Sequence, residues 1–228
     1  MILEFEDLNN ENEIKKMINY YNNHNWRGVL FNRIIKELCY SSYLELGVST
    51  GEKCYNLIEC ESKVGVDANS NLNIPGVISL TTDEYFNSLD SDIKFDLIYI
   101  DACHEKYQVY NDFCNSINHL NKGGMIILHD IFPLTEELTS VEMSNGDVYE
   151  MWIELVKNYP DKTATFIGFP GDPEGTIGIY FDSTEDLFDK NKIKKINYSY
   201  SYFSSVIPKY IYHKTITEDE IISKGRGL

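Results

Sequence analysis

Short apolar segments alternate with amphipathic ones through the middle of the chain. The apolar segments are five or six residues long and nearly continuous, which is typical of strands buried on both faces of a sheet. They are residues 43–47, 63–67, 76–80, 95–100 and 124–128. Between them the periodicity predicts one helix over Gly51–Glu59 and another with a buried face of Tyr110, Phe113, Ile117 and Leu120. Strands that alternate with helices pair in parallel, so we expect an α/β fold with a doubly wound sheet.

The pattern of apolar and polar residues is different at both ends of the chain. Two helical stripes predict two N-terminal helices, and their residues are Ile14, Met17, Ile18, Tyr21 and then Leu30, Ile34, Leu38. Near the C-terminus, residues 163–169 and 176–181 predict an antiparallel hairpin, followed by an aromatic tail expected to pack over the sheet edge. We therefore divide the chain into an N-terminal helical cap (1–42), a core (43–182) and an aromatic C-terminal extension packed on the core (183–228).

A loop from Ile131 to Gly146 separates the last parallel strand from the next helix. The helix is predicted from Asp147 and Glu150, which have the spacing of an N-cap and its N3 partner.

The formal net charge of −16 narrows the range of partners. It argues against nucleic acid and against an anionic membrane surface, while a cationic cofactor such as a sulfonium stays compatible. Solubility alone would also explain the charge. No apolar run approaches the roughly 20 residues of a membrane helix, and no secretory signal is apparent. The five cysteines are odd in number and lack C-x-x-C spacing, so we expect no disulfide framework or zinc site and a cytoplasmic location.

The first candidate binding motif is E-x-G-x-x-x-G, formed by Glu45, Gly47, Ser49 and Gly51 between the first strand and the next helix. Ligands of open α/β sheets bind at the carboxyl ends of strands, and glycine there lets the backbone approach a ligand closely. The pattern differs from the G-x-G-x-x-G of dinucleotide sites. A turn that needs glycine only for chain geometry is the alternative.

Two acidic positions extend this candidate site. Asp67 ends the second strand, where a carboxylate can accept hydrogen bonds from ribose hydroxyls, although capping of its own turn before Asn69 is the alternative. Asp83 follows the third strand and could accept from an exocyclic amine. Its neighbour Thr82 is instead compatible with a plain helix N-cap.

The most specific signal lies at the ends of the fourth and fifth strands. Asp101 ends the fourth strand, His104 follows it, and His129 and Asp130 end the fifth. Adjacent strands lie about 4.8 Å apart, so these four side chains are expected to cluster. Two carboxylates and two imidazoles suit a divalent ion, a general base or both. Helix capping by Asp101 and a purely structural role for His129 are the alternatives.

The order of these motifs resembles that of class I S-adenosylmethionine-dependent methyltransferases. It resembles in particular bacterial members linked to glycan and lipopolysaccharide modification, and metal-assisted O-methyltransferases of the catechol and macrolide-sugar type. The matching segments are Leu44–Gly51, Thr81–Phe86, Ile100–Tyr107, Gly123–Asp130 and Gly146–Tyr149. The sequence departs from the family pattern at Thr82 in place of Ser, Ala102 in place of Gly, and Tyr149 in place of Trp.

The resemblance implies a Rossmann-like, mostly parallel seven-stranded sheet with a C-terminal antiparallel hairpin. It also implies S-adenosylmethionine as the cofactor, bound by Glu45, Gly47, Ser49, Gly51, Asp67, Thr82, Asp83 and Asp101. By position it implies Asp101, His129 and Asp130 as ligands of a divalent metal, magnesium or manganese. A histidine in this set is less usual for magnesium than for manganese or iron.

The expected reaction is O-methylation of a hydroxyl on a sugar or other small polar acceptor. Asp101, His104, His129 and Asp130 would be catalytic, with His104 as the base if no metal binds. The loop with Glu136, Glu137 and Glu142 is expected to act as a lid or to recognise the acceptor. The expected partners are a small-molecule or glycan acceptor, with a homodimer as a further option. A non-catalytic S-adenosylmethionine- or nucleoside-binding module is the alternative, followed by a nicotinamide-dependent dehydrogenase, which the glycine pattern disfavours.

Overall fold

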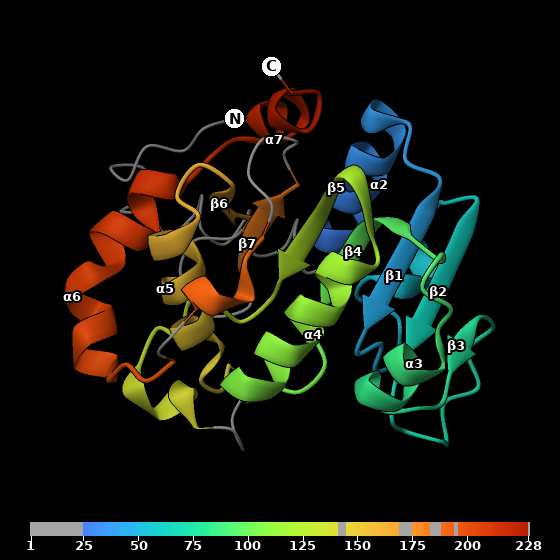
Figure 1. Ribbon diagram of the computed structural model, residues 1–228, viewed down its shortest axis with the longest axis horizontal. Coiled ribbons are helices and arrows are strands. Elements are labelled where there is room, and N and C mark those ends of the chain that lie inside the picture. Colours follow the sequence, from blue (N-terminus) through green and yellow to red (C-terminus); the bar gives the residue numbers. More distant parts are fainter. Residues whose placement is uncertain (1–24, 141–144, 169–174, 183–187, 194–195, 228) are drawn as a thin grey trace, which may run out of the picture.

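The structure is a computed structural model that describes residues 25–140, 145–168, 175–182, 188–193 and 196–227. A single seven-stranded sheet runs through it, with the strand order β3-β2-β1-β4-β5-β7-β6 (Figure 1). The strands are β1 Ser42–Leu46, β2 Ser62–Val66, β3 Val77–Ile78, β4 Phe95–Ile100, β5 Leu120–Leu128, β6 Thr163–Ile167 and β7 Thr176–Phe181. β1 to β5 pair in parallel, whereas β7 pairs antiparallel with both β5 and β6. The predicted mostly parallel sheet with its C-terminal hairpin is confirmed.

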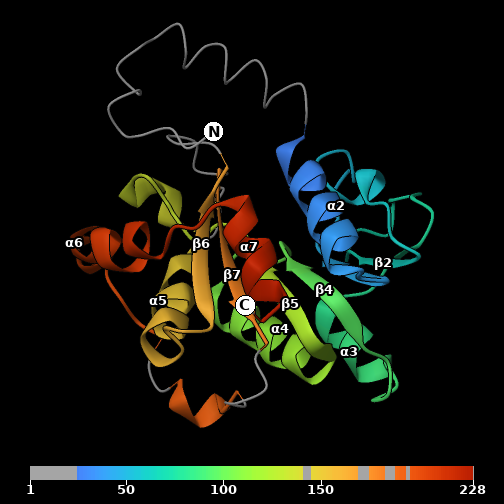
Figure 2. The same cartoon turned by 90° about the horizontal axis from the view of Figure 1, so that it is seen from above.

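Helices cover both faces of the sheet. Figure 2 shows α2 on the opposite side of the strands from α3 and α4. The helices are α2 Trp26–Leu38, α3 Thr82–Ser88, α4 Lys106–Asn118, α5 Val148–Asn158, α6 Tyr200–Tyr210 and α7 Glu218–Gly225. Side chains of a strand alternate between the faces, so β1 contributes Leu44 and Leu46 to the core beneath α4 and α5 and Tyr43 to the core beneath α2 and α7. Burial on both faces explains the continuous apolar strands of the sequence.

The helix predicted over Gly51–Glu59 is wrong. This segment forms turns and a short 3-10 helix, η2 Tyr55–Leu57. Its carbonyl groups find partners outside the segment, which removes the need for a helical ladder. Asn32 of α2 donates to Leu57 O at 2.8 Å, and the Lys63 ammonium group donates to Tyr55 O at 3.0 Å and Ile58 O at 3.1 Å.

The predicted buried face of α4 is confirmed in part: Phe113 is buried, and Tyr110 and Ile117 pack half-buried against the same core. The buried side chains of the helix are Val109, Asp112, Phe113 and Ser116, whereas Leu120 already belongs to β5. Polar Asp112 and Ser116 therefore stand at buried positions, which a hydrophobic pattern cannot reveal. Asp112 interacts with Thr82 of α3, and this becomes important for the site below.

The predicted elements at the two ends of the chain are found only in part within the described residues. The helix containing Leu30, Ile34 and Leu38 is confirmed as α2, whereas the one predicted around Ile14 lies outside the described residues. The aromatic tail forms α6, which packs on α5, and a 3-10 turn, η5 Tyr212–Lys214, beside the edge strand β6. Among the described residues, no helix is long and apolar enough to span a membrane.

The direction of the chain reverses at the centre of the sheet. From β1 the chain proceeds outward to β2 and β3, and β4 then returns to the other side of β1. In open α/β sheets, ligands bind in the crevice that such a reversal leaves at the carboxyl ends of the strands. The motifs predicted from the sequence lie at this edge.

Candidate active site

A cavity of about 770 Å³ opens at the carboxyl ends of β1, β2, β4 and β5. Every candidate site residue predicted from the sequence lines it, namely Glu45, Gly47, Ser49, Gly51, Asp67, Thr82, Asp83, Asp101, His104, His129 and Asp130. The same wall also includes side chains that the sequence did not single out, among them Arg27, Lys53, Cys54 and Gln108.

The loop after β1 needs glycine for more than its turn. Gly47 has φ +85°, and a Cβ there would lie 2.1 Å from the carbonyl oxygen of Asp101. The end of β1 therefore packs directly against the end of β4, and only glycine allows this approach. Ser49 also adopts a left-handed conformation, with φ +52°.

Asp67 fixes this loop from the neighbouring strand. One of its carboxylate oxygens accepts from the backbone N–H groups of Val48 at 3.0 Å and Ser49 at 2.8 Å. The other accepts from Asn69 N at 2.8 Å. The turn-capping role considered for Asp67 is thus present, and the residue also lines the cavity. Each carboxylate oxygen carries two lone pairs, so the one bonded to Asn69 keeps capacity for a further donor.

Glu45 lines the cavity but is almost fully buried. It is 2% exposed, and the Tyr43 hydroxyl donates to it at 2.5 Å. Burial raises the pKa of Glu45 to about 8, with the Tyr43 hydrogen bond opposing this shift and the charge of Asp101 adding to it. Glu45 therefore carries a proton at neutral pH and can donate as well as accept a hydrogen bond.

The first turn of α3 forms the opposite wall. Its N-cap is Thr81 rather than Thr82, with a capping box in which the Thr81 side chain and Glu84 satisfy each other's backbone N–H groups. This corrects the N-cap considered for Thr82. Thr82 instead lies inside the helix, where its hydroxyl accepts from the Gln108 amide nitrogen at 3.1 Å.

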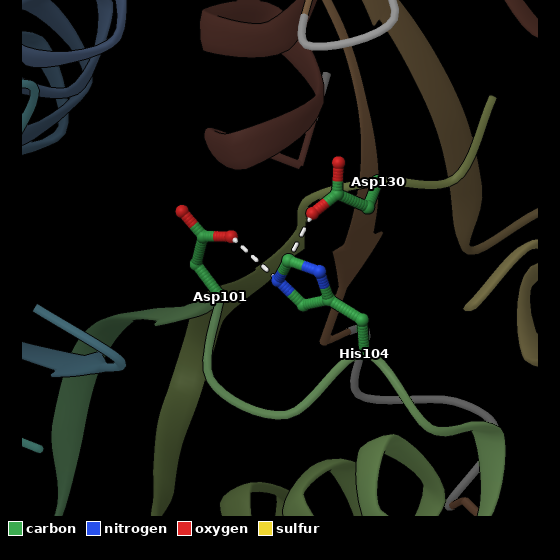
Figure 3. Close-up of side chains that lie close together, drawn as sticks. All are labelled: Asp101, His104 and Asp130. Atoms are coloured by element: carbon green, nitrogen blue, oxygen red, sulfur yellow. Dashed lines mark ion pairs between the residues drawn. The ribbon is translucent and has the colours of Figure 1, made fainter. Parts of the chain in front are cut away.

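The four residues predicted at the ends of β4 and β5 do form a cluster. His104 Nε2 lies 3.2 Å from Asp130 Oδ2 and 3.6 Å from Asp101 Oδ1, between the two carboxylates (Figure 3). His129 Nδ1 lies 3.0 Å from Asp101 Oδ1 and 2.9 Å from Asp130 Oδ2. Each imidazole thus bridges both carboxylates. Asp130 is a non-glycine residue with φ +56°, a conformation that costs free energy and that the surrounding contacts must hold.

The cluster shifts the proton affinities of its members. Although burial alone would raise it, the pKa of Asp101 is held below its usual value by His129, His104 and Arg27. Burial would lower the pKa of both histidines, but the carboxylates of Asp101 and Asp130 outweigh it. They raise the pKa of His104 and bring that of His129 to about 10.

Arg27 of α2 is a cluster member that sequence reasoning missed. One of its guanidinium nitrogens lies 3.1 Å from His129 Nε2, 3.1 Å from the Tyr99 hydroxyl and 3.5 Å from Asp101 Oδ2. Because a guanidinium only donates, it disfavours a proton on His129 Nε2. Two carboxylates face the other side of the ring, so the raised pKa of His129 is the dominant effect. Arg27 stands three residues before Leu30 on the apolar side of a predicted helix, and that placement was the available signal.

Asn145 is a second missed residue. It is fully buried, and its side-chain amide donates to Asp130 Oδ1 at 2.9 Å. Next to it, Gly146 packs against the backbone of His104, and Asp147 accepts from Lys106 N at 2.6 Å. Asp147 is the N-cap of α5 by position, but its side chain makes no cap hydrogen bond in that helix, contrary to the predicted pairing with Glu150.

A divalent ion is compatible with part of the cluster. Asp101, His104 and Asp130 offer ligand atoms that all lie within 4.8 Å of one another. The ligand set expected from the sequence was Asp101, His129 and Asp130, so His104 takes the place of His129 in this group. Two carboxylates and one imidazole form a donor set that manganese accepts readily.

The comparisons with known proteins agree with this geometry. Residues 44–131, which span β1 to the end of the cluster, match the family model described as a methyltransferase domain. This part of the chain therefore has the sequence pattern of a methyltransferase domain. No curated protein matches the chain.

Two solved structures illustrate what this chain is similar to. A Klebsiella pneumoniae protein assigned as an O-methyltransferase is 14% identical, with 75% of this chain and 90% of that chain covered and a TM-score of 0.50. The O-methyltransferase from Bacillus cereus, solved in complex with SAH, is 17% identical over 75% of this chain and 91% of that chain, with a TM-score of 0.47. At such identities the likeness concerns the fold.

Proposed function

We propose that this methyltransferase transfers the methyl group of S-adenosylmethionine to a hydroxyl group on a sugar or other small polar acceptor. One observation carries the proposal. The glycine loop with Asp67 and Asp83, and the cluster of Asp101, His104 and Asp130, line the same cavity. A methyl donor held by the first group would present its methyl carbon toward the second.

The cofactor would occupy the side of the cavity formed by β1, β2 and α3. Its ribose hydroxyls would donate to Asp67, which keeps acceptor capacity beyond its backbone contacts. Its methionine end would lie near Gly47, which lines the cavity together with Asp101 and Glu45. The adenine amine would face Asp83 on the first turn of α3.

The acceptor would meet the methyl group beside the cluster. The sulfonium carbon is already electrophilic, so catalysis consists of aligning the acceptor and removing its proton. The acceptor oxygen forms a bond to the methyl carbon as the carbon–sulfur bond breaks, and S-adenosylhomocysteine leaves. The hydroxyl proton would pass to the imidazole of His104, whose side chain is partly exposed in the cavity, with Asp101 and Asp130 stabilising the resulting imidazolium.

A divalent ion, magnesium or manganese, is part of the proposal. Asp101 and Asp130 would hold it, with one histidine as the third protein ligand: His129 by analogy with the related enzymes, or His104, which forms a group of possible ligands with the two carboxylates. When bound, it would lower the pKa of a hydroxyl group coordinated to it.

The acceptor class is supported by the polar side chains that line the cavity at the cluster, among them Asp101, His104 and Asp130. The segment from Ile131 to Thr139 leaves β5 directly beside Asp130 and carries Glu136 and Glu137 in a short 3-10 helix. Carboxylates suit a hydroxylated or cationic acceptor better than a phosphorylated one. Glu142, also proposed for acceptor recognition, lies outside the described residues.

Calorimetry and an acceptor screen test the proposal. The protein should bind S-adenosylhomocysteine and show no comparable affinity for NAD. A panel of free sugars, nucleotide sugars and catechols, assayed for S-adenosylhomocysteine release, should identify hydroxyl acceptors. Tight NAD binding without S-adenosylhomocysteine binding would overturn the cofactor assignment, and methylation confined to amines or thiols would overturn the acceptor class.

A further inference from the structure

The side-chain amide of Gln108 connects two helices at the cofactor side of the cavity. Its nitrogen, whose two hydrogens are shared among three acceptors, lies 3.1 Å from Thr82 Oγ1, 3.2 Å from Asp83 Oδ1 and 3.0 Å from Asp112 Oδ1. Thr82 and Asp83 belong to α3, whereas Gln108 and Asp112 lie one turn apart on α4. Gln108, Thr82 and Asp83 all line the cavity.

The surroundings determine which way this amide points. Two carboxylates and a hydroxyl converge on one end of Gln108, and carboxylates repel an amide oxygen while they accept from an amide nitrogen. Asp112 is fully buried and so holds its end of the arrangement in place. Within the described part of the chain its second oxygen has no hydrogen-bond partner, so Gln108 and Thr82 carry its polar contacts. The arrangement is therefore anchored in the core rather than on the surface.

Asp83, by contrast, is exposed at the cavity and free to rotate without this contact. The bond from Gln108 occupies its Oδ1 atom. Among the residues that the structure describes, no other donor bonds to its carboxylate, so Oδ2 is left to accept from a bound molecule. Holding one oxygen fixes where the other points.

We propose that Gln108 is a positioning residue that aims the Asp83 carboxylate at the exocyclic amine of the cofactor's base, and thereby makes the site selective for adenine. This inference rests on the proposed cofactor function. An amine at C6 of the purine donates to a carboxylate, whereas a keto oxygen at C6 presents a second acceptor and is repelled. A site built to pair with a donor discriminates strongly against an analogue that lacks it.

The test compares the binding of S-adenosylhomocysteine and S-inosylhomocysteine, which differ at that group, by calorimetry. The wild-type protein should favour the adenosyl compound by about 10- to 100-fold, the range of a hydrogen bond to a charged group. Gln108→Met keeps the length of the side chain and removes its donor. It should reduce this preference by about fivefold or more, mainly by weakening adenosyl binding.

Two further variants separate aiming from support of the fold. Gln108→Lys restores a donor between the same carboxylates and should recover most of the preference. Asn111→Met removes an exposed amide one turn further along α4 and should leave the preference unchanged. If Gln108→Met does not fold, the preference of Gln108→Lys is compared with that of the wild-type protein. A side chain that acts only by packing would not be replaced by lysine without loss.

The outcomes are distinct. A wild-type protein that binds neither compound overturns the proposed function and this inference with it. Adenosyl binding without a preference over inosyl, an unchanged preference in Gln108→Met, or a lost preference in Gln108→Lys overturns the inference and leaves the proposed function intact.

Discussion

Asn145 donates a hydrogen bond of 2.9 Å to Asp130, and both side chains are buried. Asp130 has the left-handed φ of +56° that few non-glycine residues adopt, and its side chain contacts both histidines of the cluster. The bond from Asn145 therefore helps to hold a strained residue in the orientation that the proposed chemistry needs.

Replacing Asn145 by alanine should lower methyl transfer by about 10- to 100-fold, the usual effect of losing a partner that orients a ligating or catalytic group. Affinity for S-adenosylhomocysteine should change less than twofold, because the cofactor side of the cavity is untouched. The measurements are turnover with an acceptor from the screen and calorimetry. Asn158→Ala, which removes a partly buried amide bonded to Glu154, is the control and should keep turnover. Equal losses in both variants would show general destabilisation instead.

Gly146 and His104 provide a test of the same region by steric means. A Cβ at Gly146 would lie 2.0 Å from the carbonyl oxygen of His104, and the backbone has φ +58°. Gly146→Ala should therefore lower the free energy of unfolding by more than the 1–2 kcal/mol or so that a left-handed conformation costs an alanine. Gly123→Ala is the matched control, because Gly123 has φ +78° with nothing within 4 Å. Urea unfolding that gives the same loss for both variants would contradict the close packing at His104.

Asp67→Ala should weaken binding of S-adenosylmethionine by about 1.5–3 kcal/mol, the range of a hydrogen bond to a charged group. The loss has two sources, since Asp67 also holds the backbone of Val48 and Ser49. Asp96 offers a control, because it likewise accepts from two backbone N–H groups, those of Ser41 and Ser42, at the opposite end of the sheet. Asp96→Ala should reduce stability and leave cofactor affinity unchanged. Calorimetry showing a similar loss of affinity in both variants would argue against a direct role of Asp67.

Glu45 makes stability depend on pH. Its pKa is raised from 4.5 to about 8 in the folded protein. Between these values the folded state retains a proton that the unfolded state releases, so stability falls as pH rises through this window, by at most about 1.4 kcal/mol per pH unit for one proton. Glu45→Gln cannot titrate. The difference in unfolding free energy between wild type and Glu45→Gln should therefore shift against the wild type from pH 5 to pH 8 and level off above that. A constant difference across this range would show that Glu45 ionises normally.

The sequence predicts the central elements of this fold better than its margins. The strand at Phe95–Ile100 was predicted with the bounds observed, because a central parallel strand is buried on both faces and its apolar run is continuous. The segment Gly51–Glu59 was predicted as a helix because its periodicity is local. The side chains that satisfy its carbonyl groups, Asn32 and Lys63, come from other elements.

The residues of the candidate site also fall into those that the sequence predicts and those that it misses. Residues such as Asp101 and Asp130 follow apolar strands, so their meeting at one edge can be read from the order of the strands. Arg27, Gln108 and Asn145 reach the site from helices and a loop, through contacts that span long stretches of chain. Such contacts depend on how the layers pack, which the pattern along the chain does not encode.

The last prediction concerns the ligands of a divalent ion. Two histidines contact both carboxylates, but only His104 belongs to the group of Asp101, His104 and Asp130 whose ligand atoms lie within 4.8 Å of one another. His129 faces Arg27 with its other nitrogen, and a guanidinium beside that nitrogen disfavours a second cation there. We therefore expect Mn²⁺ titrations followed by calorimetry to show binding that Asp130→Asn abolishes and His104→Ala weakens by about tenfold or more. His129→Ala should weaken it less. Metal affinity lost with His129 and kept without His104 would favour the ligand set expected from the sequence. If the wild-type protein binds no Mn²⁺ and EDTA leaves turnover unchanged, the metal is no part of the reaction, and His104→Ala should then abolish methyl transfer.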